Sequence, residues 1–154
     1  MTPKFHSLQI KNIRKETKSC VSISFDLPKE LQADYQYQSG QYLTFRSTIQ
    51  GEDVRRSYSL CSAPSDQEWR VAIKQVENGV FSTFALHELK EGDFLDVMNP
   101  MGNFKLETNV ANEKSYVLFA AGSGVTPIFS IAKSILREEP KSHVTMFYGN
   151  QGFS

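Results

Sequence analysis

The chain has 154 residues with 17 Lys plus Arg and 17 Asp plus Glu, so its formal net charge is zero. The cations are scattered rather than clustered, which argues against a nucleic acid partner. The two cysteines, Cys20 and Cys61, form no disulfide or metal-ligand pattern, and no apolar run is long enough to span a bilayer. We therefore expect a cytoplasmic protein without a metal site or a membrane contact. Its length allows one full domain and part of another.

Residues 1–108 contain short segments in which apolar and polar residues alternate, with turn residues such as Pro28 and Gly51 between them. Alternation places every second side chain on one face of a strand. The apolar members are Leu8, Ile10, Val21, Ile23, Phe25, Leu43, Phe45, Ile49, Trp69, Val71, Ile73, Leu95 and Val97. This pattern predicts an antiparallel β-barrel or sandwich.

The first candidate site is the extended segment around Arg56 and Tyr58. On a strand these two side chains project to one face, while Ser57 and Ser59 project to the other. A guanidinium binds phosphate oxygens in pairs, and an aromatic ring packs against a planar group. FAD is a ligand that is both anionic and flat. Taken alone, the segment is also typical of a half-exposed strand with a surface tyrosine.

The second candidate site is a loop that turns into a helix over residues 78–89. Gly79 permits close backbone approach, Ser82 or Thr83 is expected to cap the helix, and Gly92 is expected to mark its end. Free backbone N–H groups at such a helix start attract phosphate. An ordinary capped helix is the alternative interpretation.

The third candidate site is a strand–turn–helix–strand unit near the end of the chain. Residues 117–121 predict a buried parallel strand, Pro127 is placed at the first helical position, and a helix follows over 128–136. Residues 144–149 predict a second buried strand. The glycine turn at 122–124 lies where a nucleotide pyrophosphate binds in such a unit, although Pro127 replaces the third glycine of the dinucleotide fingerprint. A tight turn without a ligand is the alternative.

Taken in this order, the segments resemble the ferredoxin–NADP⁺ reductase superfamily. Within it they are most similar to reductase components of multicomponent oxygenases of the phenylacetate-degradation type. The matching strings are Gly40-Gln41-Tyr42-Leu43-Thr44-Phe45, Arg56-Ser57-Tyr58-Ser59-Leu60, Val71-Ala72-Ile73-Lys74, Gly79-Val80-Phe81-Ser82, Pro100-Met101-Gly102-Asn103-Phe104, Ala121-Gly122-Ser123-Gly124-Val125-Thr126-Pro127 and Phe147-Tyr148-Gly149-Asn150.

The resemblance implies a fold in two parts. An antiparallel Greek-key, flavin-binding β-barrel is expected over residues 1–108, followed over 109–154 by an incomplete Rossmann-like segment. That segment corresponds to the N-terminal part of an NAD(P)-binding domain, so the chain is expected to be truncated relative to the family. The apolar face of its helix is expected to pack on the barrel, pair with another chain or be poorly ordered.

The resemblance also implies roles for individual residues. Arg56 would bind the FAD pyrophosphate, and Tyr58 would pack along the flavin or ribityl. Ser59 would act as the catalytic residue near flavin N5, where hydride arrives. The strand at 72–74 would run beside the cofactor, residues 79–82 would bind the phosphates a second time, and the glycine turn would open to the nicotinamide. The implied cofactor-binding residues are Arg56, Ser57, Tyr58, Ser59, Ala72, Ile73, Lys74, Gly79, Val80, Phe81, Ser82, Gly122, Gly124, Thr126 and Pro127.

The implied activity is an FAD-dependent oxidoreductase that takes electrons from NAD(P)H and passes them to an iron–sulfur carrier or an oxygenase. Two alternatives remain open at this point. One is a barrel that binds flavin or a partner without catalysis, and the other is an enzyme that uses FMN in place of FAD. The sequence does not distinguish NADH from NADPH.

Overall fold

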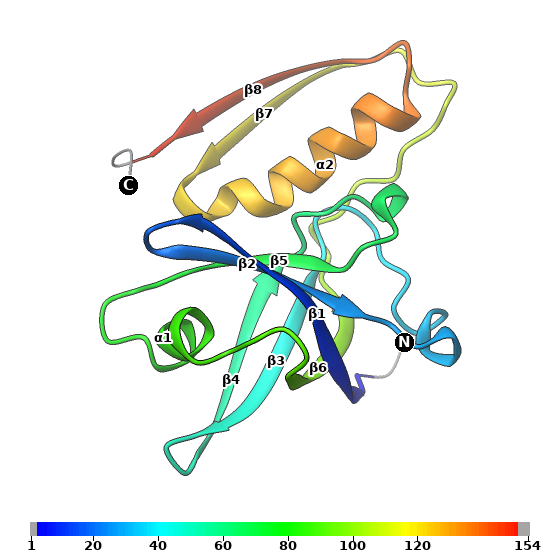
Figure 1. Cartoon of the computed structure of the whole chain (residues 1–154). Coiled ribbons are helices and arrows are strands. Elements are labelled where there is room, and N and C mark those ends of the chain that lie inside the picture. Colours follow the sequence, from blue (N-terminus) through cyan, green and yellow to red (C-terminus); the bar gives the residue numbers. More distant parts are fainter. Residues whose placement is uncertain (1–2, 151–154) are drawn as a thin grey trace.

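The computed structural model describes residues 3–150, which form two parts (Figure 1). The larger part is a six-stranded antiparallel sheet with strand order β4-β3-β6-β1-β2-β5. Its strands are β1 (Phe5–Thr17), β2 (Cys20–Asp26), β3 (Tyr42–Ile49), β4 (Glu52–Ser59), β5 (Arg70–Lys74) and β6 (Phe94–Met101). The smaller part contains the parallel strands β7 (Ser115–Ala121) and β8 (His143–Gly149), which are connected by helix α2 (Val125–Glu138).

The large sheet curls until its two edge strands meet just beyond β4. Leu60 forms an isolated antiparallel bridge with Val71, and the backbone N–H of Cys61 donates to the carbonyl of Arg70 at 2.9 Å. All six strands belong to this one curled sheet rather than to two stacked sheets. The predicted antiparallel barrel is therefore confirmed, and the sandwich alternative is not.

The barrel interior is filled by the apolar side chains of the alternating segments, as their pattern predicts. Those buried most completely are Leu8, Ile10, Ile23, Leu43, Phe45, Leu60, Val71, Ile73 and Val97. Helix α1 (Val80–His87) adds Phe81, whose ring stacks on that of Phe45 with centroids 5.9 Å apart and an interplanar angle of 12°. This ring stack attaches the helix to the core.

The ends of α1 differ from those expected. Gly79, rather than Ser82 or Thr83, is the N-cap, and the helix ends at His87 rather than near Gly92. The Ser82 hydroxyl lies inside the first turn, where it donates to the carbonyl of Gly79 at 3.2 Å. A Cβ at Gly79 would lie 2.4 Å from that hydroxyl oxygen, so the close fit of the turn requires glycine at the cap.

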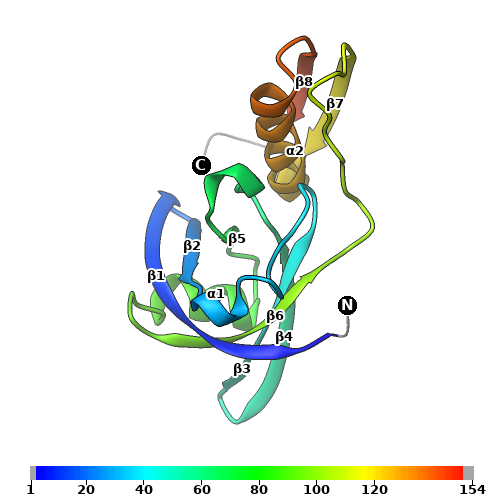
Figure 2. The same ribbon diagram turned by 90° about the vertical axis from the view of Figure 1, so that its right-hand side faces the viewer.

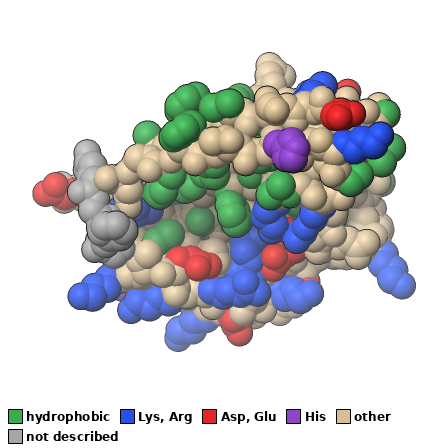
Figure 3. Space-filling model, turned by 90° about the horizontal axis from the view of Figure 1, so that it is seen from above, with side chains coloured by type: hydrophobic (Ala, Val, Ile, Leu, Met, Phe, Trp, Pro, Cys, Tyr) green, Lys and Arg blue, Asp and Glu red, His purple; other side chains and the backbone are tan. Residues whose placement is uncertain are grey.

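The two strands of the small sheet are not buried as predicted. Its outer face is exposed, with exposed fractions of 56% for Val117, 71% for Phe119 and 54% for Phe147. Viewed from above, hydrophobic side chains gather over this sheet (Figure 3). The apolar run indicated a strand covered on both faces, but within residues 3–150 α2 covers only one of them.

Helix α2 lies between the small sheet and the barrel (Figures 1 and 2). The apolar side chains expected to line one of its faces are buried, namely Ile128, Ile131, Ala132 and Ile135. The helix begins at Val125, so Pro127 is its third residue rather than its first. Proline remains compatible with this position because N–H groups of the first turn have no intrahelical acceptor.

Glu139 fastens the connection between the two parts to the end of α2. Its buried carboxylate accepts hydrogen bonds from the Asn109 backbone N–H at 3.1 Å, the Asn112 side chain at 2.7 Å and the Ser142 hydroxyl at 2.7 Å. Burial opposes ionisation, but these hydrogen bonds outweigh it and lower the pKa of Glu139 to about 2. In the part of the chain that the structure describes, neither helix has the length and apolar character needed to span a bilayer.

We expect Phe81→Ala to destabilise the chain by about 3–5 kcal/mol, since it removes a fully buried ring and leaves a cavity. The free energy of unfolding from chemical denaturation measures this effect. Val80→Ala is the matched control, because Val80 is the preceding helical residue and 39% exposed. Equal, small effects of the two substitutions would contradict a core role for Phe81.

Candidate functional site

Strand β4 places Arg56 and Tyr58 on the same face, as alternation predicts. In the antiparallel register Arg56 lies opposite Phe45, and Ser57 lies opposite Thr44. Directly opposite residues share a face of the sheet. The hydroxyls of Ser57 and Thr44 meet at 2.8 Å, so Ser57 turns away from the face that carries Arg56.

Arg56 differs from its neighbours in having no acidic partner among the residues that the structure describes. Arg46 pairs with Asp96 at 2.7 Å, and Arg55 pairs with Asp53 at 3.3 Å. Among residues 3–150, no carboxylate forms an ion pair with Arg56, which is exposed and donates only to the carbonyl of Arg55, at 2.7 Å. An exposed guanidinium without a counter-ion is available to bind phosphate.

Tyr58 connects this cation to the core and to helix α1. Its ring lies 5.8 Å from the centroid of Phe45 and 5.8 Å from that of Phe81. Burial raises the pKa of the Tyr58 phenol, and the nearby Arg56 guanidinium opposes that shift. The ring contact with Phe81 brings β4 next to the start of α1, so the first two candidate sites lie side by side.

The start of α1 offers its backbone rather than its side chains. Phe81 is 1% exposed and Ser82 is 4% exposed, and the Ser82 hydroxyl also accepts from the Val76 N–H at 3.2 Å. In this structure the Ser82 hydroxyl proton is directed to the Gly79 carbonyl, and the predicted role of residues 79–82 in phosphate binding stays a prediction. The N–H groups of the first helical turn are the donors that this segment offers to an anion.

Ser59 ends β4 with a half-buried hydroxyl that makes no hydrogen bond to another described residue. It is therefore available to a ligand at this end of the strand. On β5, Ile73 points into the core with 0% exposure, Ala72 is half-buried and Lys74 is exposed. Since β5 is an edge strand, any contact of residues 72–74 with a cofactor falls mainly to the backbone.

The glycine turn before α2 forms an open surface. A Cβ at Gly122 or Gly124 would meet nothing within 4 Å, and Gly122 adopts a φ of +51°. Thr126 donates its hydroxyl to the carbonyl of Ser123 at 3.0 Å, which closes the turn. Within residues 3–150, no hydrogen bond joins this turn directly to Arg56, Tyr58 or Ser59. The third candidate site is therefore an exposed turn, and it belongs to the smaller part of the fold.

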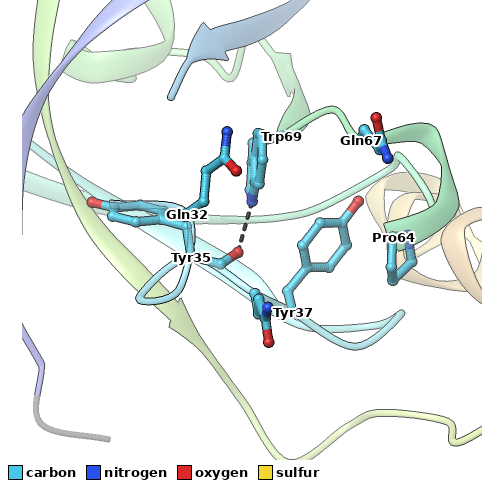
Figure 4. Close-up of a pocket in the computed structure, with 7 residues that line it drawn as sticks. Gln32, Tyr35, Tyr37, Pro64, Gln67 and Trp69 are labelled. Atoms are coloured by element: carbon cyan, nitrogen blue, oxygen red, sulfur yellow. Dashed lines mark hydrogen bonds between the residues drawn. The ribbon is translucent and has the colours of Figure 1, made fainter. Parts of the chain in front are cut away.

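A cavity of ≈ 480 Å³ lies at a different place, between the loop after β2 and the turn before β5 (Figure 4). Its rings are held at their polar ends: the Trp69 indole N–H donates to the Tyr35 carbonyl at 2.7 Å, and the Tyr37 hydroxyl donates to the Glu68 carbonyl at 3.0 Å. None of the predicted site residues lines this cavity. The aromatic residues at 35, 37 and 69 are the sequence signal for it, and they brace the turn before β5.

Comparison with known proteins agrees with this arrangement. Residues 7–106 match the family model described as the oxidoreductase FAD-binding domain, and residues 118–153 match the oxidoreductase NAD-binding domain. These features define a flavin-binding oxidoreductase domain of the ferredoxin reductase-like fold. The chain belongs to the oxidoreductase FAD-binding domain family, as the resemblance predicts.

Two curated relatives match nearly the whole chain, and the name of the second describes it as a ferredoxin reductase component. One, a component of 1,2-phenylacetyl-CoA epoxidase from Escherichia coli (strain K12), is 39% identical over 147 residues, which cover 96% of this chain and 41% of the relative. The other, the ferredoxin reductase component of 3-ketosteroid-9-alpha-monooxygenase from Rhodococcus rhodochrous, is 34% identical over 146 residues, covering 94% of this chain and 40% of the relative. The chain therefore spans about two fifths of the length of these relatives.

Solved structures show the same fold. The flavohem-like FAD/NAD-binding domain of nitric oxide dioxygenase from Vibrio cholerae O1 biovar El Tor has a TM-score of 0.77 and 27% identity, covering 95% of this chain and 62% of that one. Phthalate dioxygenase reductase, described as transferring electrons from pyridine nucleotides to [2Fe-2S], has a TM-score of 0.77 and 26% identity, covering 96% of this chain and 44% of that one.

We expect Arg56→Ala to weaken FAD binding about ten- to hundredfold while the fold survives, because a lost charge-assisted hydrogen bond costs about 1.5–3 kcal/mol. Titration of the flavin-free protein with FAD measures the change in Kd. Arg55→Ala is the matched control, since Arg55 points to the opposite face and is paired with Asp53. An unchanged affinity of the Arg56 variant would refute the assignment.

Proposed function

We propose that this chain is the flavin-bearing part of a reductase that takes electrons from NAD(P)H and delivers them to an iron–sulfur protein or an oxygenase component. The observation that carries the proposal is the unpaired guanidinium of Arg56 beside the Tyr58 ring, next to the start of α1. The names of the two curated relatives support the electron acceptors proposed.

In this proposal the residues of β4 and α1 hold FAD in a fixed orientation. Arg56 and the N–H groups at the start of α1 bind the pyrophosphate from two sides, and Tyr58 packs along the flavin or ribityl. Two phosphate contacts favour FAD over FMN. Bound flavin accepts a hydride and releases electrons singly, which is the chemistry that links a nicotinamide to a one-electron carrier.

Ser59 completes the flavin site in the proposal. Its free hydroxyl donates a hydrogen bond at the end of β4, where we place flavin N5. The turn that contains Gly122, Gly124, Thr126 and Pro127 guides the nicotinamide toward that position, because its open glycines allow the backbone to approach a dinucleotide closely.

We also propose a division of the chain into a flavin domain over residues 1–108 and the first part of a nucleotide domain over 109–154. The change from an antiparallel to a parallel sheet between β6 and β7 supports this boundary. A cytoplasmic setting belongs to the same proposal, supported by Cys20 and Cys61, which are both free thiols.

The 154-residue chain should retain FAD but should be reduced slowly by NADH and NADPH. The described residues offer the nicotinamide only an exposed turn, whereas hydride transfer needs the nicotinamide held roughly 3–3.5 Å from the flavin. Stopped-flow bleaching of the flavin absorbance measures the rate, which we expect to rise linearly with nucleotide concentration without saturating.

Three outcomes would change this proposal or the rate expected from it. A chain that binds no flavin would refute it, and a flavin that neither nucleotide bleaches would indicate a non-enzymatic flavin-binding module. Fast, saturable reduction would show that the nicotinamide is already held, by this chain or by a second copy. Repeating the experiment over a range of protein concentrations separates those two explanations.

A further inference from the structure

A stripe of polar residues on α2 faces the barrel. Ser130, Lys133, Ser134 and Arg137 recur at helical spacing, so they lie along one side of the helix. The Ser130 hydroxyl donates to the Ser62 carbonyl at 2.6 Å. The Ser134 hydroxyl meets that of Ser39 at 2.5 Å, and both residues are buried.

Asp66 binds both cations of this stripe. Its two carboxylate oxygens form ion pairs with Lys133 Nζ and Arg137 Nη1, and its side chain is 15% exposed. One of these oxygens also accepts the Ala63 backbone N–H at 2.8 Å, which fixes the carboxylate within its own turn. Burial opposes ionisation of Asp66, but the hydrogen bonds from Lys133 and Arg137 hold its pKa at about 2.

The turn that carries Asp66 is rigidly supported. The Ser62 hydroxyl donates to the Glu68 carbonyl at 2.7 Å and accepts from the Arg70 N–H at 3.1 Å. The Tyr37 hydroxyl contacts Ser62 at 2.9 Å from the aromatic cavity. The Asp66 carboxylate is therefore carried by a turn whose position is fixed by hydrogen bonds to the barrel.

Each side of this contact follows one of the two candidate ligand surfaces closely in the sequence. The turn at 62–66 continues directly from β4, three residues after Ser59. On the other side, Lys133 lies two helical turns beyond Thr126, which is in the first turn of α2. A shift of α2 relative to the turn at residues 62–66 would move the glycine turn at 122–124 relative to β4.

The ion pairs and hydrogen bonds between α2 and the barrel are better suited to fixing the position of the helix than to stabilising the fold. Apolar packing tolerates small displacements, whereas hydrogen-bonded ion pairs require particular distances and directions. Polar interfaces between domains also permit relative motion more readily than apolar cores do. The contact of Ser130, Lys133, Ser134 and Arg137 with the barrel, called the seam below, therefore favours one placement of α2 while it is intact and lets α2 move when it is broken.

We propose that Asp66, Lys133 and Arg137 form a positioning clamp that holds the turn at residues 122–127 in register with the flavin face of β4. The inference rests on the proposed function and assigns these three as positioning residues, since none of them belongs to the flavin or nicotinamide contacts proposed above. The clamp sets how often a nicotinamide held at the glycine turn reaches the flavin.

The test compares Asp66→Asn with the parent chain loaded with FAD. Asparagine keeps the size of the side chain and its ability to accept the Ala63 N–H, but removes the charge that binds both cations. The bimolecular rate of flavin reduction by NADH should fall about ten- to hundredfold, as expected for a displacement of about 1 Å between reacting groups. The Kd for FAD should stay within twofold, which separates positioning from general loss of structure.

Four further variants sharpen the test. Lys133→Met should lower the reduction rate in the same way, and combining it with Asp66→Asn should add less than the two separate effects predict. Asp66→Glu should retain part of the rate because it keeps the charge. Lys141→Met is the matched control, since Lys141 is exposed and lies outside the seam.

Amide hydrogen exchange provides a readout that needs neither flavin nor nucleotide. Exchange in α2, β7 and β8 should accelerate in Asp66→Asn, while exchange in the barrel strands stays unchanged. An unchanged reduction rate in the flavin-loaded variant, or a rate that falls in parallel with FAD affinity, would overturn the clamp alone. A parent chain that binds no flavin would instead overturn the proposed function, and the clamp's role in hydride transfer with it.

Discussion

The contact of the Phe81 ring with Phe45 and Tyr58 is the interaction on which the candidate flavin site depends. Phe45 belongs to the barrel core, Phe81 to the first turn of α1, and Tyr58 to the strand that carries the unpaired cation. Helix α1 has only eight residues and no side-chain cap, so local interactions alone would hold it weakly. Its attachment through Phe81 places its free N–H groups beside β4. The same buried surface that stabilises the barrel therefore also brings together the groups of the candidate anion-binding site.

The two parts of the fold are held by different kinds of interaction. The barrel is closed around apolar side chains, whereas the contact of α2 with it includes hydroxyls, a backbone carbonyl and a carboxylate shared by two cations, besides the packing of Ile131 against Gly40. An apolar core gains stability in proportion to buried area and is not directional. A polar seam gains less in total, but its hydrogen bonds depend on distance and direction and are lost when the parts shift by about 1 Å. This difference suits a protein that needs a stable flavin platform and a defined but separable nucleotide segment.

How far the sequence predicts the structure depends on whether the deciding contact is local. Alternation correctly predicts the barrel and the shared face of Arg56 and Tyr58, because period-two geometry acts within each strand. The cap of α1 and the burial of β7 are predicted wrongly, because the close fit around Gly79 and the neighbours that cover a strand leave no local signal. The pairing of Asp66 with Lys133, 67 residues away, could not be predicted from the sequence either, because a polar stripe on a helix is also typical of a solvent-exposed face. The roles of the individual site residues remain predictions.

We propose Arg56 as the phosphate ligand because the other arginines of this region are already paired with acids. Arg55 and Asp53 are two residues apart on β4 and therefore share a face, so their pairing is set by the strand itself. Arg46 lies directly opposite Asp96 in the register of β3 and β6, and this pair depends on the sheet topology. Because Arg55 and Arg46 are each neutralised by an acid, Arg56 is the cation of this region that has no carboxylate partner among the described residues. It lies beside the ring of Tyr58. The candidate site is thus defined as much by the acids that neutralise the neighbouring arginines as by the residue proposed to bind the ligand.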